Sequence, residues 1–501
     1  MLRCMLPLYS LIGSFIGVAS LLSAGLAAAE PTLSKPNILF ILTDDLGYSD
    51  VSCYGAKTVK TPHVDALAAG GLMFTDFHTG ANICSPSRAC FLTGAYPQRN
   101  GTYMGLNQNR EAHWFLGLNP EEITLAEQCK GQGYQTFIVG KWHLGKEEKF
   151  SFFQQGFDHY YGAPDNFGHS QSFYDGRERM ARIPLTQLTE KYAARVIKDI
   201  DTAGDQPFFH YFAHNYPHTP FKAGPKFAGS SQGGVRGDVM QELDWGIGLV
   251  VEHLEKTGKL DNTLVIFTSD NGPLSPAFSA PYRGTKYTTF EGGHRVPFIL
   301  HWPAAIQGAR VVETPVTAMD LFPTVSEIIG APMPDDRKYD GVSLVPLFAG
   351  DGPIERSADT PFFYYNCENL QAVRVGDWKL HLPRSPDQIP FWQTNRGIAK
   401  LDQPLLYHLA DDPAESKDVA AEHPEVVSLI LKIAEETRPL LGEYLQRGSE
   451  QRATGSLFPE VPVVSHNRDW EKLPLAERGR GASEFKAGKP EKKRAPRKKK
   501  R

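Results

Sequence analysis

Four largely hydrophobic runs stand out in the first half of the chain, and each leads into polar side chains. The runs are residues 37–42, 136–140, 207–212 and 264–267. Because their hydrophobic residues are consecutive and do not alternate with polar ones, we expect strands buried on both faces. Segments with helical spacing lie between the runs, at residues 64–69, 125–132 and 239–254. This alternation predicts an α/β domain with a mostly parallel central sheet.

The pattern changes near residue 350. A polar, proline-bounded stretch at 353–361 is typical of a linker, and short strand-like runs follow at residues 362–365, 372–375, 378–382 and 406–409. Hydrophobic spacing predicts a helix over residues 425–445. We therefore expect a large α/β domain at residues 30–352, a smaller α+β domain with an antiparallel sheet at 362–450, and an extension at 451–501.

The N-terminus has the composition of a secretory signal peptide. Arg3 precedes a hydrophobic stretch at residues 6–26, and the three alanines at 27–29 supply an A-x-A cleavage site before Glu30. We expect residues 1–29 to be removed and the mature protein to be exported, either to a periplasm or out of the cell. The alternative is an uncleaved membrane anchor, because the hydrophobic stretch is long.

Charge is distributed unevenly along the chain. The 501 residues carry a formal net charge of −4, which gives no reason to expect a nucleic-acid partner. Residues 489–501 contain nine Lys or Arg and one Glu, so this tail carries +8 and the rest of the chain −12. Such a block is typical of a solvated, disordered tail. The alternative is an electrostatic contact with a polyanion or an acidic surface.

One cysteine has the surroundings of a reactive group. The segment 84–94 reads Cys-Ser-Pro-Ser-Arg-Ala-Cys-Phe-Leu-Thr-Gly. Ser85 is a good N-cap, Pro86 suits the first helical position, and Gly94 stands where a helix needs a left-handed closing residue. Cys84 is therefore expected just before a helix N-terminus, where anions are favoured and a thiol has a lowered pKa. The alternative is a buried or disulfide-bonded structural cysteine.

Polar residues with metal-binding potential follow two of the hydrophobic runs. Asp44 and Asp45 follow the first run, and Asp270 and Asn271 follow the fourth. In open α/β sheets, ligands bind outside the carboxyl ends of the strands. Four hard oxygen ligands suit Ca²⁺ or Mg²⁺ and do not suit zinc or copper. Either pair alone is also a common turn sequence.

Cationic and imidazole side chains follow the other two runs. Lys141 and His143 come directly after the second run, where a buried pair two residues apart could face an anion. The alternative, which this pair alone would favour, is a solvated lysine and a capping histidine. His218 lies between Pro217 and Pro220 in a constrained loop, whereas His214 is interpreted as structural.

Taken together, these segments resemble the sulfatase family. Residues 84–94 match the C-x-P-S-R-x-x-x-L-T-G signature without a gap, and the flanking Thr-Asp-Asp-Leu-Gly, Gly-Lys-Trp-His and Thr-Ser-Asp-Asn-Gly segments are similar to family motifs. Residues 284–293 resemble the segment that supplies a second sulfate-binding lysine, here Lys286. The likeness extends over roughly residues 35–418. It is strongest to the branch of arylsulfatase A and the N-acetylgalactosamine-6-sulfatases.

The resemblance implies an alkaline-phosphatase-like α/β core with a small C-terminal sheet domain. It also implies that a maturation enzyme oxidises Cys84 to formylglycine (3-oxoalanine). One Ca²⁺ would then be bound by the formylglycine oxygen and by the side chains of Asp44, Asp45, Asp270 and Asn271. The implied activity is that of an arylsulfatase-type sulfuric ester hydrolase. A sulfated carbohydrate is the expected substrate.

The same resemblance assigns roles to the remaining residues. One hydroxyl of the formylglycine hydrate would attack sulfur, and the other would let the sulfate leave as the aldehyde re-forms. Lys141, Lys286 and Arg88 would neutralise the sulfate oxygens together with the metal. His218 would protonate the leaving oxygen and His143 would deprotonate the hydrate, and these two roles are open to exchange or to sharing with Lys286.

Two other functions fit parts of the pattern. A phosphonate or phosphate monoester hydrolase of the same superfamily typically has Asp-His-Gly where this chain has Asp270-Asn271-Gly272. A non-catalytic protein that binds a sulfated polymer would be expected to have lost Cys84, a metal ligand or a lysine, and all are present. The loops at 102–114 and 150–182 leave the substrate open; His113, Trp114, His159 and Tyr160 are candidates for a sugar pocket or for ordinary surface aromatics.

Overall fold

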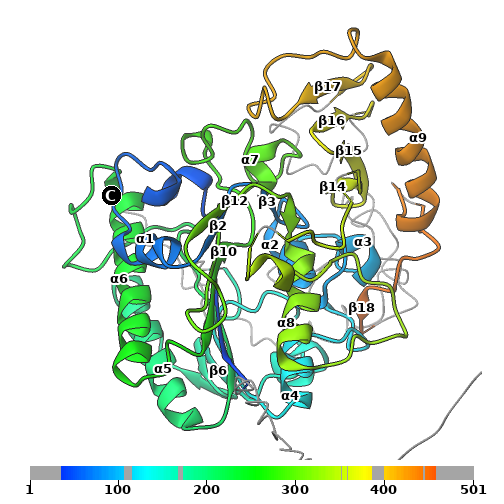
Figure 1. Ribbon diagram of the computed structural model, residues 1–501. Helices are drawn as coiled ribbons and strands as arrows, with labels where there is room; N and C mark the ends of the chain where they lie inside the picture. Colours follow the sequence, from blue (N-terminus) through cyan, green and yellow to red (C-terminus); the bar gives the residue numbers. More distant parts are fainter. Residues whose placement is uncertain are drawn as a thin grey trace, which may run out of the picture. The chain divides into compact units, whose positions relative to one another are not determined.

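The four hydrophobic runs form the centre of a ten-stranded sheet in the computed structural model (Figure 1). Strand β1 (Asn37–Thr43) lies between β10 (Thr263–Ser269) and β9 (Phe208–Ala213), and β5 (Gln135–Gly140) lies beside β9. All three of these pairings are parallel. The predicted α/β architecture with a mostly parallel sheet is therefore confirmed.

The structure describes residues 35–457, apart from residues 107–114, 167–172, 351, 358, 386–399 and 444–445. The expected signal peptide and basic tail lie outside the described residues, as do His113 and Trp114. Among the helices that the structure describes, none is both long and apolar enough to cross a membrane. The five cysteines in this part of the chain are all free thiols.

Both faces of the sheet are buried, which explains why the strands are continuously hydrophobic. Along β1, Ile38 and Phe40 belong to one hydrophobic cluster, whereas Leu39 and Ile41 belong to the other. Helices α1, α5 and α6 cover one face, and α2, α4 and α8 cover the other (Figure 1). Their bounds are α1 Pro62–Ala69, α2 Cys84–Thr93, α4 Leu125–Gly131, α5 Leu188–Ala203, α6 Gly234–Lys256 and α8 Leu321–Ile329.

Shorter strands complete the sheet on either side, in the order β12-β2-β11-β10-β1-β9-β5-β6-β7-β8. Strand β11 is antiparallel to both β10 and β2. The added strands are β2 Leu72–Phe74, β6 His159–Gly162, β7 Phe173–Asp175, β8 Glu178–Met180, β11 Phe298–His301 and β12 Arg310–Val312. The remaining short elements of this region are β3 Phe77–His78, β13 Val316–Thr317, α3 Pro97–Asn100 and α7 Glu291–His294.

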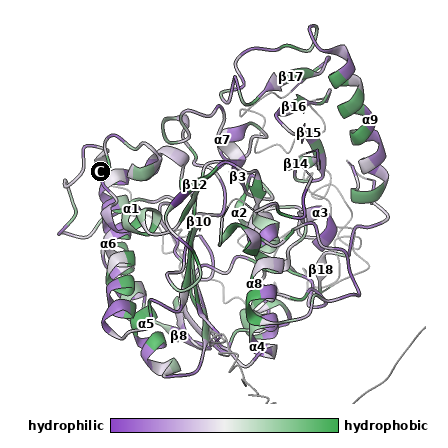
Figure 2. Ribbon diagram, in the orientation of Figure 1, coloured by the Kyte–Doolittle hydropathy of each residue, from purple (hydrophilic) through white to green (hydrophobic). Residues whose placement is uncertain are grey.

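The C-terminal region forms a four-stranded antiparallel sheet with one helix. Its strands, in spatial order, are β14 Phe362–Asn366, β15 Asn369–Val375, β16 Trp378–His381 and β17 Leu405–His408. Helix α9 (Pro424–Leu441) carries both hydrophobic and hydrophilic patches (Figure 2), and its buried residues recur at helical spacing. It ends four residues earlier than predicted, because Gly442 leaves the helix with φ +90°. The chain then returns, and β18 (Gly455–Ser456) pairs with β4 (Leu116–Gly117).

A buried network of charges joins the C-terminal sheet to the segment that contains α7. Glu291 lies 2.7 Å from His78 Nε2 and 2.8 Å from Lys379 Nζ, and Lys379 also lies 3.0 Å from Glu415. The Glu291 backbone N–H donates to Glu415 at 2.6 Å. Burial raises the pKa of Glu291, but Lys379 and His78 outweigh it and hold that pKa well below its usual value. The network thus fixes the chain five residues beyond Lys286.

Candidate active site

Two acidic pairs meet at the carboxyl ends of the adjacent strands β1 and β10. Thr43 is aligned with Ser269, so Asp44 and Asp45 emerge beside Asp270 and Asn271. The Asp45 backbone N–H donates to Asp270 Oδ1 at 3.2 Å, and Asn271 Nδ2 donates to Asp45 Oδ1 at 2.8 Å. All four side chains are fully buried.

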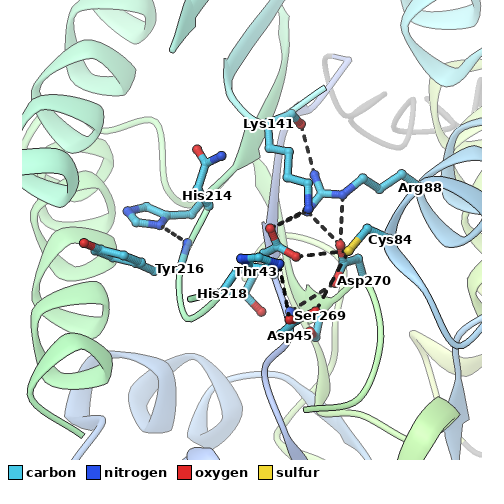
Figure 3. Close-up of polar contacts among 12 residues, drawn as sticks. Thr43, Asp45, Cys84, Arg88, Lys141, His214, Tyr216, His218, Ser269 and Asp270 are labelled. Carbon is cyan, nitrogen blue, oxygen red and sulfur yellow. Dashed lines mark hydrogen bonds and ion pairs between the residues drawn. The ribbon is translucent and has the colours of Figure 1, made fainter. Parts of the chain in front are cut away.

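Cys84 completes this cluster from the start of α2 (Figure 3). Its Sγ lies 3.4 Å from Asp44 Oδ1 and 3.9 Å from Asp45 Oδ1. One ligand atom from each of Asp44, Asp45, Cys84 and Asp270 falls within 4.8 Å of all the others. The polar residues that the sequence places at separate strand ends are therefore brought to one point.

The local surroundings of Cys84 differ from the prediction in two respects. The helix begins at Cys84 itself, with Ile83 as N-cap, and Ser85 Oγ instead accepts the Leu106 backbone N–H at 3.1 Å. Gly94 closes the helix in the predicted left-handed conformation, with φ +65°. The pKa of Cys84 is raised, not lowered, because burial and the charge of Asp270 outweigh Lys141 and Lys286. An unmodified thiol here is a poor nucleophile at neutral pH.

Three cations surround the acidic cluster. Lys141 Nζ lies 2.6 Å from Asp44 Oδ2, and Arg88 Nε donates to Asp270 Oδ2 at 2.9 Å. Lys286 Nζ contacts Asp45 Oδ1 and lies 2.9 Å from Cys84 Sγ. Burial alone would raise the pKa of Asp44, but Lys141 and the other nearby cations hold it well below its usual value.

The two expected catalytic histidines occupy different environments. His218 Nε2 lies 3.7 Å from Asp45 Oδ2, and its side chain is 16% exposed. His143 is buried, and its backbone N–H donates to Pro164 O at 2.8 Å. Burial and the charge of Lys141 hold the pKa of His143 well below its usual value, so its imidazole stays neutral at physiological pH. Its Nδ1 has no hydrogen-bond partner among the residues that the structure describes.

His214 uses both ring nitrogens in contacts away from the cluster, as Figure 3 shows for its contact with Tyr216. The Tyr216 backbone N–H donates to His214 Nδ1 at 2.9 Å, and Nε2 lies 3.2 Å from Thr189 Oγ1. Protonation of Nδ1 would place its N–H against the Tyr216 N–H, so the charged form of His214 is disfavoured. Burial lowers the pKa of His214 to about 3.

We expect His214 to make the fold sensitive to acid. Because its pKa is lower in the folded state than in the unfolded chain, the unfolded chain takes up the proton first, and stability falls as pH drops from about 6.5 toward 3. His214→Asn keeps an acceptor for Tyr216 and removes the ionisation. Across that range, chemical unfolding should show the variant losing less stability, by about 1.4 kcal/mol per pH unit. Parallel pH profiles for the two proteins would contradict this account.

The donor set fits a hard cation. In the part of the chain that the structure describes, Asp45 Oδ2 and Asn271 Oδ1 are buried and receive no hydrogen bond. Such atoms are costly unless an ion or water contacts them. The charges of Asp44, Asp45 and Asp270 are balanced by Arg88, Lys141 and Lys286. A divalent cation would therefore leave a net charge of about +2, which suits an anionic substrate.

Two candidates for a sugar pocket lie away from the acidic cluster, whereas two residues that sequence alone did not single out support it. Tyr160 is buried and donates to Gly140 O at 2.9 Å, and His159 stacks on Phe137, so neither lines this site. Ser269 Oγ accepts the Leu46 N–H at 3.0 Å and holds the loop after β1. Arg236, on α6, is buried behind the acidic cluster. A lone arginine in a long helix carries no sequence signal of such a position.

Comparison with known families accounts for both regions of the chain. Residues 36–331 match the sulfatase family model, and residues 357–458 match the model of the C-terminal region of aryl-sulfatase. The chain belongs to the sulfatase family. It is 35% identical to human arylsulfatase A over 89% of this chain and 95% of that protein. It is 34% identical to dog N-acetylgalactosamine-6-sulfatase over 82% of this chain and 86% of that protein.

Solved structures agree with this assignment. A protein of a glycosaminoglycan-metabolism locus of Bacteroides thetaiotaomicron superposes with a TM-score of 0.72 at 29% identity, covering 81% of this sulfatase and 99% of that chain. A sulfatase from Pseudoalteromonas sp. superposes with a TM-score of 0.71 at 27% identity, covering 80% and 90%. The fold is therefore that of the sulfatases, and the chain is a sulfuric ester hydrolase.

Proposed function

We propose that this sulfatase is exported and hydrolyses sulfate esters of carbohydrates, using formylglycine derived from Cys84 and one Ca²⁺. The observation that carries the proposal is the convergence of Cys84, three carboxylates and three cations at one buried point. Asn271, where related phosphonate monoester hydrolases typically have histidine, favours sulfate esters.

In this proposal, the cations of the site bind the sulfate group. Lys141 and Lys286 come from different segments of the chain, and they contact Asp44 and Asp45 respectively. Lys286 Nζ also lies 2.9 Å from the sulfur of residue 84. Arg88 donates to Asp270 and to the Lys141 carbonyl at 3.0 Å, which keeps the guanidinium in place. Fixed positive groups in a buried site stabilise the charge that develops on non-bridging oxygens during displacement at sulfur.

Two proton transfers are assigned to the histidines. His218 is the most exposed of the polar side chains proposed for the site, so it faces the side from which an alcohol leaving group departs. It is the proposed acid for that oxygen. His143 is neutral and has an unpartnered Nδ1 among the described residues, so it is the proposed base at residue 84.

The residues present suit both Ca²⁺ and formylglycine, the two groups that the proposed reaction requires. The oxygens of Asp44, Asp45, Asp270 and Asn271 would hold Ca²⁺, which when bound neutralises sulfate charge as a Lewis acid. Formylglycine at residue 84 would supply, as its hydrate, a hydroxyl nucleophile and a route for releasing the sulfate as the aldehyde re-forms.

Sulfated carbohydrate is the proposed substrate class because several relatives carry such names. Dog N-acetylgalactosamine-6-sulfatase is named for a sulfated sugar, and the Bacteroides protein belongs to a glycosaminoglycan locus.

The first test is mass spectrometry of the tryptic fragment of residues 61–88, from protein made in its own host. The fragment should have lost the sulfur and two hydrogens of Cys84 and gained one oxygen. The mature chain should begin at Glu30, and a chelator should reduce the hydrolysis of sulfated sugars and of an aryl sulfate. An unmodified thiol in active enzyme would overturn the proposed nucleophile, and full activity after metal removal would overturn the role of Ca²⁺.

A further inference from the structure

A single buried arginine connects three segments behind the acidic cluster. Arg236 Nη2 donates to the Asp45 carbonyl at 2.8 Å, and Nη1 donates to the Pro217 carbonyl at 3.1 Å. Nε and Nη2 also contact the Asp50 carboxylate at 3.1 and 2.6 Å. The arginine thus touches the backbone of a proposed metal ligand and the residue before the proposed acid, His218.

The two loops that Arg236 joins also share a backbone hydrogen bond, in which the Asp44 N–H donates to the Tyr216 carbonyl at 3.1 Å. Arg236 adds the contacts to the Asp45 and Pro217 carbonyls. Asp45 adopts a left-handed conformation with φ +66°, which is strained for a residue with a Cβ. The carboxylate of Asp50 also accepts the Gly47 N–H at 2.7 Å, so the turn after Asp45 is tied to the same ion pair. The guanidinium packs 4.4 Å from the ring centre of Phe278, which closes it off on that side.

We propose that Arg236 is a positioning residue that sets the relative placement of Asp45 and His218 for catalysis. It does not reach the substrate, and its effect passes through the two backbone carbonyls. This inference rests on the proposed function, because it takes Asp45 as a metal ligand and His218 as the acid. Nothing in the sulfatase motifs of the sequence points to it.

The geometry requires a guanidinium and not merely a positive charge. Arginine presents several N–H groups in a rigid planar fork, so one side chain satisfies two carbonyls and a carboxylate at once. A lysine at this position would keep the charge for Asp50 but could not hold both carbonyls in one plane. Displacement of a reacting group by about 1 Å can reduce a rate by about 10²-fold.

The test compares Arg236→Lys with Arg99→Lys in the full-length, matured enzyme. Arg99 is a matched control, because its side chain is 4% exposed against 6% for Arg236 and it binds Asp340 through two nitrogens at 2.8 and 2.9 Å. Two measurements are made: kcat and KM for an aryl sulfate, and Tb³⁺ luminescence titration of the metal-depleted protein. We expect Arg236→Lys to lower kcat by about tenfold or more with a smaller change in KM, and to weaken Tb³⁺ binding.

The outcomes separate this inference from the proposed function. Arg99→Lys should lose thermal stability but keep kcat and Tb³⁺ affinity. Equal kcat and Tb³⁺ affinity in the two folded variants would overturn the role of Arg236 while leaving the proposed function intact. A parent enzyme that neither binds Tb³⁺ nor hydrolyses sulfate esters would overturn both. If Arg236→Lys does not fold, Asp50→Asn, which loosens the same guanidinium, should lower kcat and Tb³⁺ affinity, and no effect would overturn the proposal.

Discussion

Cys84→Ala should abolish turnover of sulfate esters while leaving the fold intact. The proposed nucleophile forms only from the cysteine side chain, so we expect kcat/KM to fall by a factor on the order of 10⁴ or more. Asp44, Asp45 and Asp270 remain in place, so Tb³⁺ should still bind, although more weakly because one ligand is lost. Kinetics on an aryl sulfate and luminescence titration measure the two effects separately.

Cys90→Ala is the matched control for this experiment. Cys90 lies on the same helix, is equally buried and packs toward Gly80, away from the acidic cluster. Its removal should cost some packing energy and leave kcat near the parent value. Parent-like turnover by Cys84→Ala would rule out residue 84 as the nucleophile, whereas inactivity of both variants would point to a loss of structure in α2.

Lys286→Met should slow the hydrolysis of sulfate esters and, at the same time, tighten metal binding. Removing the ammonium beside Cys84 takes away a charge that binds sulfate, so kcat/KM should fall by about 10²- to 10³-fold. The same ammonium competes with a cation for Asp45, so Tb³⁺ should bind more tightly, by about tenfold. Without metal the variant should also unfold more easily, because the buried Asp45 carboxylate loses the ammonium that contacts it.

Lys379→Met serves as the comparison for that variant. Lys379 is also a buried lysine between carboxylates, but its partners are Glu291 and Glu415, in the charge network that joins the C-terminal sheet to the segment that contains α7. Its loss should destabilise the fold by about 3–5 kcal/mol without tightening Tb³⁺ binding. If Lys286→Met weakened both catalysis and Tb³⁺ binding, the lysine would act by supporting the structure of the site and not by its charge.

The buried charge network connects the C-terminal region to the segment that carries Lys286, a residue of the candidate active site. Lys286 lies on a segment whose far end, Glu291, is fixed by Lys379 from β16 and by the backbone contact with Glu415. The near end is fixed by the Lys286 N–H, which donates to Pro273 O at 2.8 Å, just beyond Asn271. The position of the lysine therefore depends on both regions of the chain.

Much of this arrangement can be read from the sequence, for reasons that are local. Consecutive hydrophobic residues such as Ile38 to Leu42 are typical of a strand covered on both faces, and parallel strands bring their carboxyl ends to one edge. The polar residues after those strands therefore had to lie near one another. Gly94 likewise ends its helix in the left-handed conformation that glycine adopts without strain.

The tertiary structure decided what depends on burial and on neighbours distant in sequence. Sequence alone predicts a lowered pKa for Cys84 from its place at a helix start, but full burial beside Asp270 raises it. Tyr160 is a candidate sugar-binding aromatic in the sequence, but in the fold its ring stacks on Phe152 and is buried. The contacts of Arg236 with Asp45 and Pro217 arise only when α6 packs against two strand ends. The sequence by itself thus determined the chemical groups and the edge of the sheet where they gather, whereas folding determined their ionisation and their mutual support, because both depend on solvent exclusion and distant charges.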